Sequence, residues 1–187
     1  MQTSGSLHDI QTARKEDVPR FVSPRRVVSE LNVWRGDHVL DYVSGAGHFV
    51  PHLCAAVGGD GRVYARNQSD VHHGMLVRDT VARGRREVTP LLHATDDVEL
   101  DIVAGTIDAV LLTNVLSRET SRIEPLLSEI ERVVRREGKL CVVDWRVHEN
   151  TERALIELLA QFGFTPKRNL SPHAVGWYHY GILFSKT

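Results

Sequence analysis

Short apolar runs and longer periodic stretches alternate along the chain, which is the pattern of β-strands followed by α-helices. Strands are predicted at residues 37–43, 62–67, 88–94, 107–115 and 139–145. Between them, apolar residues recur at helical spacing, most clearly from Ile123 to Val134, in a helix expected to end at Gly138. Five strand–helix alternations specify a parallel sheet with helices on both faces.

The end of the chain departs from this alternation. After a helix at residues 151–163, an extended segment at 164–170 and an alternating strand at 176–186 follow, with a turn and no further helix between them. The predicted fold is therefore α/β: a doubly wound, mostly parallel sheet of seven strands that closes with an antiparallel hairpin. Residues 1–20 are expected to be an extension, flexible or a lid, and residues 21–187 a single domain.

Composition narrows the class of protein. The 187 residues are 42% hydrophobic and 25% charged, with a net charge of −1, so no overall field attracts nucleic acid or anionic lipid. No apolar run approaches the ~20 residues of a membrane span. Cys54 and Cys141 lie in apolar runs, as buried thiols of a reducing compartment do. A cytoplasmic protein is expected, without a metal site, because no cysteine pair stands beside the histidines.

The stretch DYVSGAGHF, residues 41–49, joins the first strand to the next helix. In doubly wound folds a glycine turn at this point lets the backbone approach a ligand closely. Gly45 and Gly47 keep two such positions, but Val43 stands where a first glycine belongs. The dinucleotide pattern G-x-G-x-x-G also fails, because Val50 occupies the place of its third glycine.

Five segments in order resemble the class I S-adenosylmethionine-dependent methyltransferases, over most of the chain. WRGDHVLDYVSGAGHF is similar to the family's opening motif V-L-D-x-G-x-G-x-G, and GGDGRVYARNQS to its second strand. IDAVLLTNVL resembles the fourth strand, EIERVVRREGKLCVVDW the following helix and fifth strand, and FGFTPKRN with GWYHYGILFSK the closing hairpin of the small-molecule branch. The resemblance implies a Rossmann-like fold that binds S-adenosylmethionine and releases S-adenosylhomocysteine.

The resemblance assigns the cofactor site to particular residues, some of which depart from the family pattern. Asp41, Gly45, Gly47 and Asn114 match it. Val43 replaces the first glycine, and Asn67 replaces the acid that holds the ribose, with one acceptor oxygen where a carboxylate has two. The acid expected beside the adenine is displaced by a residue or two, to Asp96 or Asp97. These changes are expected to weaken the cofactor site.

Candidates for the chemistry lie at the ends of the last strands. Methyl transfer is an in-line displacement, which requires a base only if the acceptor must lose a proton. Asp144 is a candidate base, or else it caps the loop that follows it. His179 either faces the substrate or pairs within the hairpin, and Trp145 either lines the acceptor pocket or packs in the core.

Three functions stay open on the sequence. The first is a methyltransferase that acts on a small-molecule acceptor, as a monomer or homodimer, without a nucleic-acid or membrane surface. The second is a catalytically inactive methyltransferase-like protein that acts as a binding or regulatory partner, which Val43 and Asn67 favour. The third is a nucleotide-linked oxidoreductase, against which the missing third glycine argues.

Overall fold

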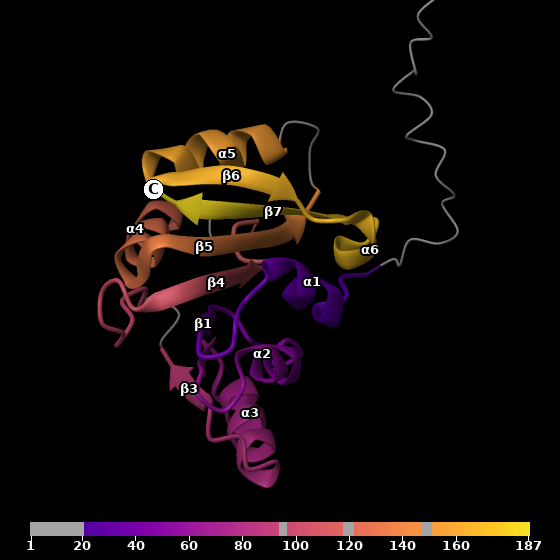
Figure 1. The fold of residues 1–187 in the computed structure, drawn as a ribbon, viewed down its shortest axis with the longest axis vertical. Helices are drawn as coiled ribbons and strands as arrows, with labels where there is room; N and C mark the ends of the chain where they lie inside the picture. Colours follow the sequence, from indigo (N-terminus) through magenta and orange to yellow (C-terminus); the bar gives the residue numbers. More distant parts are fainter. Residues whose placement is uncertain (1–20, 94–96, 118–121, 147–150) are drawn as a thin grey trace, which may run out of the picture.

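The computed structural model describes residues 21–93, 97–117, 122–146 and 151–187. Its centre is one seven-stranded sheet in the order β3-β2-β1-β4-β5-β7-β6 (Figure 1). The strands are β1 (His38–Asp41), β2 (Arg62–Asn67), β3 (Val88–Leu92), β4 (Ile107–Thr113), β5 (Val134–Trp145), β6 (Phe164–Asn169) and β7 (His179–Lys186). β7 is antiparallel to both of its neighbours, and the other recorded pairs are parallel. The predicted fold class is confirmed.

Six helices are recorded in the described residues, and they cover both faces of the sheet. They are α1 (Pro24–Leu31), α2 (Val50–Val57), α3 (Asp70–Ala82), α4 (Ile123–Val133), α5 (Thr151–Gln161) and α6 (Pro172–Val175). Buried side chains of α4 and α5 form a core with one face, and those of α1, α2, α3 and α6 form a core with the other (Figure 1). These apolar layers hold the strand ends in fixed positions.

Two predictions are wrong: the turn expected between the last two strands contains the short helix α6, and one helix boundary is misplaced. The helix expected to stop at Gly138 ends at Val133, and Val134 already has the extended backbone of β5. Gly138 serves close packing instead, because a Cβ there would lie 2.6 Å from Val134 Cγ1 and 2.8 Å from the Arg135 carbonyl oxygen. The register between β4 and β5 shifts at this point, so the chain bulges before pairing resumes at Lys139.

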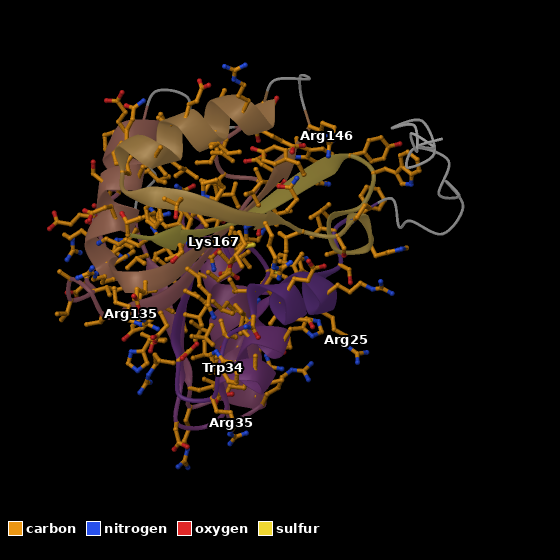
Figure 2. All side chains as sticks on the ribbon, turned by 45° about the horizontal axis from the view of Figure 1, so that its top comes forward. Arg25, Trp34, Arg35, Arg135, Arg146 and Lys167 are labelled. Atoms are coloured by element: carbon orange, nitrogen blue, oxygen red, sulfur yellow. The ribbon has the colours of Figure 1, made fainter. Side chains whose placement is uncertain are left out.

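The surface carries charges on several sides. Figure 2 shows Arg25, Arg35, Arg135 and Arg146 well apart from one another, not gathered on one face. Among the helices of the described residues, none has the length and apolar character needed to cross a bilayer.

Candidate functional site

The glycine loop follows β1 at the centre of the sheet, where the strand order reverses between β1 and β4. Such a reversal leaves a crevice at the carboxyl ends of the strands. Gly45 and Gly47 have φ angles of +54° and +84°, which side chains rarely adopt. A Cβ on Gly47 would lie 3.1 Å from Leu76 Cδ1, whereas one on Gly45 would meet no described atom within 4 Å. Gly45 therefore faces open space.

Asp41 ends β1 directly before this loop and is completely buried. Neither of its carboxylate oxygens has a hydrogen-bond partner among the described residues. Burial raises the pKa of this carboxyl group from 3.8 to about 7, because removal from water disfavours the charged form. A buried carboxylate without partners is costly, so a positive charge nearby would stabilise the ionised form of Asp41.

A cavity of about 590 Å³ opens above the loop, within the range typical of small-molecule sites. Four predicted site residues meet in its wall: Val43, Gly45, Asn114 and His179. The rest of its described lining is Phe21, Val22, Pro24, Ser44, His48, Phe49, Thr113 and Trp145. Trp145 thus lines the pocket, as one of its two predicted roles required.

Three residues of the cavity wall carry buried polar atoms. The Ser44 hydroxyl, the Thr113 hydroxyl and the side-chain oxygen of Asn114 are buried, and none has a partner within the described part of the chain. Asn114 has a φ of +54° and donates its backbone N–H to the Val143 carbonyl oxygen at 2.9 Å, which fixes its position after β4. Unsatisfied buried groups in a native structure point to a missing ligand or water.

Val43 does not fill the cavity. Its half-buried side chain packs against the core beneath α4 and α5 and forms part of the cavity wall. The space above Gly45 stays open beside it. The methyl groups of Val43 therefore narrow the site without closing it.

The end of β2 forms a second polar position, outside the recorded lining of this cavity. Asn67 is buried, and its side-chain amide nitrogen has no partner in the described ranges. Beside it, the fully buried Arg66 lies 4.3 Å from the centre of the Tyr42 ring and donates to the Asp97 carbonyl oxygen at 2.7 Å. Arg66 thereby ties the segment after β3 to β2. The predicted residue Asp96 lies outside the described residues.

His179 is the first residue of β7 and is 3% exposed. Its ring lies 4.1 Å from that of Trp145, centroid to centroid, with the planes at 34°. Neither ring nitrogen has a hydrogen-bond partner among the residues described. Burial lowers the pKa of this imidazole below 6.5, and the neighbouring Asp144 carboxylate partly opposes the shift. A neutral imidazole in a cavity wall can accept a proton.

Asp144 is turned away from His179's cavity. Its carboxylate accepts the backbone N–H groups of Trp145 at 2.7 Å and of Ser117 at 3.1 Å. Asp144 lines a smaller cavity of about 210 Å³ under α5, which shares Trp145 with the larger one. These bonds are what a loop-capping role requires, the alternative that the sequence left open.

The first described residues lie over the site because α1 is fastened to the end of the chain. The Ser23 N–H donates to the Ala174 carbonyl oxygen at 2.8 Å, and the Glu30 carboxylate accepts from Arg168 at 2.8 Å and from the Ser171 N–H. Phe21 consequently reaches the cavity mouth, 67% exposed. The predicted extension over residues 1–20 lies outside the described residues.

Several site residues could not be singled out from the sequence. Ser44 and Thr113 are adjacent to predicted motif positions, and nothing else in the sequence marked them. Arg66 looked like an ordinary strand residue. His48 and His52 stand four residues apart, a spacing that some metal sites use. His48, however, lines the main cavity and His52 the groove between α1 and α2. Within the described residues, no group of three His, Cys, Asp or Glu side chains is placed to hold a metal.

A comparison with protein-family models matches residues 40–142 to a family described as a methyltransferase domain. The matched segment runs from β1 to β5 and includes the glycine loop, Asn67 and Asn114. No curated protein sequence matches the chain.

Solved structures share the fold. A SAM-dependent methyltransferase from Aquifex aeolicus superposes with a TM-score of 0.76 at 22% identity, over 89% of this chain and 91% of that one. A geranyl diphosphate methyltransferase in complex with SAM gives 0.70 at 13% identity, over 88% and 84%. The [4+2]-cyclase SpnF gives 0.68 at 15% identity, over 87% and 80%. A fold of this kind therefore carries more than one chemistry.

Proposed function

The chain belongs to the methyltransferase-domain family of class I S-adenosylmethionine-dependent methyltransferases, and we propose that it transfers a methyl group from S-adenosylmethionine to a small-molecule acceptor. The observation that carries this proposal is one cavity that joins the glycine loop to His179. The loop end of the cavity suits the cofactor, and the β7 end suits the acceptor.

The residues present fit the cofactor. Gly45 leaves open space where a side chain would stand, and Ser44, Thr113 and Asn114, each with a buried polar atom that has no partner in the described residues, line the same cavity. Asp41, a buried acid directly before the loop, lies outside the recorded lining of the cavity, and its carboxylate would attract a positively charged ligand without direct contact. Hydrogen bonds from a bound ligand would offset desolvation costs of about 1–3 kcal/mol for each of these groups.

The residues of the acceptor end have separate tasks. When bound, S-adenosylmethionine supplies a methyl group on a positively charged sulfur, open to in-line displacement by a nucleophile. His179 accepts the proton that the acceptor loses, because its nitrogens have no competing partner among the described residues. Trp145 and Phe21 cover the acceptor and exclude water. Asp144 serves as a positioning residue through its backbone bonds, not as the base.

A second candidate function is that of an inactive relative which has lost its cofactor. Val43 in the cavity wall and Asn67 at the end of β2 favour it, because each weakens a contact that the family pattern uses. A charge-assisted hydrogen bond contributes about 1.5–3 kcal/mol, so its loss at Asn67 lowers affinity by about one or two decades.

Thermal unfolding with a panel of ligands separates these functions. A ligand at 100 times its Kd raises the unfolding free energy by about 2.7 kcal/mol, equivalent to a Tm rise of about 5–10 °C for a chain of this length. We expect this rise with S-adenosylhomocysteine and none with NAD⁺ or ATP. No shift with any sulfur ligand at millimolar concentration would support the inactive relative, and a shift with NAD⁺ alone the oxidoreductase.

A further inference from the structure

The acceptor end of the main cavity is aromatic. Trp145 and Phe21 are 36% and 67% exposed, and they line the cavity together with the buried His179. The tilted contact of Trp145 with His179 holds the indole in place beside the imidazole. Flat rings recognise flat ligands, since stacked or edge-to-face aromatic pairs add about 0.5–1.5 kcal/mol beyond the area they bury.

The same cavity lacks fixed charge. Among its described lining residues there is no Asp, Glu, Lys or Arg. The neighbouring charges are engaged elsewhere: Arg146 pairs with Glu152 at 2.7 Å, and the Asp144 carboxylate accepts two backbone N–H groups. An ionised acceptor would lose its hydration here without gaining a counter-charge from the residues that line the cavity, which is unfavourable.

His179 adds a chemical requirement. A buried, neutral imidazole is of use for an acceptor that must release a proton during transfer. A hydroxyl on an aromatic ring, with a pKa near 10 as in tyrosine, gives up its proton about five or six orders of magnitude more readily than water. A weak base such as His179 therefore suits an aromatic hydroxyl far better than an aliphatic alcohol.

Resting on the proposed methyl transfer, we infer that the acceptor is an uncharged aromatic hydroxyl compound whose ring lies against Trp145 and whose hydroxyl meets His179. The hydroxyl proton passes to a nitrogen of His179 while an oxygen electron pair forms the new bond to the methyl carbon. The electron pair of the broken carbon–sulfur bond returns to sulfur, which becomes neutral. The products are an aryl methyl ether and an imidazolium that returns its proton to water.

Three matched probes test the inference by binding alone: 2-naphthol, the anion 2-naphthoate and the saturated alcohol decahydro-2-naphthol. Titration calorimetry is run on the free protein and on protein saturated with S-adenosylhomocysteine. We expect 2-naphthol to bind at least tenfold more tightly than either analogue. Equal or tighter binding of the carboxylate, or of the saturated alcohol, would overturn the inference.

Two tryptophan variants locate the contact. Trp145→Leu should weaken 2-naphthol binding about 3–10-fold and leave the saturated alcohol unchanged. Trp34→Leu is the control, because Trp34 is exposed and lies well apart from Arg146, the neighbour of Trp145 (Figure 2). An equal effect of both variants would place the ring elsewhere and contradict the inference.

Failure of the proposed function gives a different result. In that case S-adenosylhomocysteine does not bind, whatever the order of the three probes on the free protein. If S-adenosylhomocysteine binds and the probe order fails, the methyl transfer proposal stands and the acceptor class is wrong. If S-adenosylhomocysteine binds and the probe order is as expected, mass spectrometry should detect methylated 2-naphthol after incubation with S-adenosylmethionine. His179→Gln should reduce the formation of this product at least 100-fold while 2-naphthol binding changes less than threefold.

Discussion

The imidazole of His179 lies against the indole of Trp145, 4.1 Å between ring centres, and faces the same cavity as the glycine loop. The two residues are direct partners in the antiparallel pairing of β5 and β7. The hairpin that closes the sheet thus delivers a titratable ring to the crevice formed by the parallel strands. A proton acceptor and a flat apolar surface come together through strand register alone.

The first prediction concerns the charge of His179. Because burial lowers its pKa, its NMR titration should have a midpoint below 6.5, and Asp144→Asn should lower that midpoint further by removing the charge that opposes the shift. The unfolded chain takes up this proton more readily than the folded one, so the free energy of unfolding should fall as pH drops below about 6.5. His179→Gln should remove that part of the pH dependence. A midpoint at or above 6.5 would contradict the burial described here.

Asp41 should produce the opposite pH dependence. Its pKa is raised to about 7, so between about pH 4 and 7 the folded chain holds a proton that the unfolded chain has lost. The free energy of unfolding contributed by Asp41 should therefore fall as pH rises through this window. We expect Asp41→Asn to gain stability relative to the wild type between pH 5 and pH 8, measured by urea denaturation.

Ligand binding provides a second test of Asp41. A positively charged ligand favours the ionised carboxylate, so the affinity for S-adenosylmethionine, whose sulfur carries a positive charge, should rise between pH 6 and 8 in the wild type and stay level in Asp41→Asn. Equal pH profiles for the two proteins would show that Asp41 does not interact with the ligand.

Alanine substitutions at the two loop glycines should distinguish effects on stability from effects on ligand binding. Gly45→Ala and Gly47→Ala each force a side chain into left-handed backbone, at about 1–2 kcal/mol. Gly47→Ala should cost more, because its Cβ also meets Leu76 at 3.1 Å. The new methyl group of Gly45→Ala would enter the cavity. This variant should therefore lose more S-adenosylhomocysteine affinity, measured by calorimetry, than its loss of stability, measured by urea denaturation, can explain. Unchanged affinity in Gly45→Ala would place the ligand away from the loop.

Part of this arrangement follows directly from the sequence pattern. Apolar runs and helical periodicity are local features, and they predicted the strands, the glycine turn and the closing hairpin. A proline within a strand favours an edge position, because it cannot donate a ladder hydrogen bond, and Pro90 lies in β3, which is an edge strand of the sheet. Gly138 was misread because, in the sequence alone, a glycine required for close packing looks the same as a glycine that ends a helix.

The rest depends on long-range contacts. Whether Asp144 or His179 faces the cavity is set by the register of β5 against β7, and the continuous apolar run at residues 140–143 does not reveal that register. Phe21 reaches the site only because Ser23 bonds to Ala174, 151 positions along the chain. The burial of Arg66 over Tyr42 follows from the pairing of β1 with β2, and nothing in a strand pattern marks an arginine as buried.

Restoring the family pattern at Val43 and Asn67 should strengthen cofactor binding. Val43→Gly removes methyl groups from the cavity wall, and Asn67→Asp restores a second acceptor oxygen at the end of β2. Together they should raise the affinity for S-adenosylhomocysteine about 10–100-fold, equivalent to about 1.4–2.8 kcal/mol. The double variant Val43→Ala with Asn67→Gln is the control and should gain much less. No gain in Val43→Gly with Asn67→Asp would mean that other residues limit the site.

The most direct measurement is titration calorimetry of the wild-type chain with S-adenosylhomocysteine at pH 7.5, with Gly45→Ala beside it. A Kd of about 1–100 µM for the wild type, weakened at least tenfold in Gly45→Ala, is the result we predict for a cofactor seated on the glycine loop. No heat of binding at millimolar ligand, in protein that is folded by circular dichroism, would contradict the proposed methyl transfer.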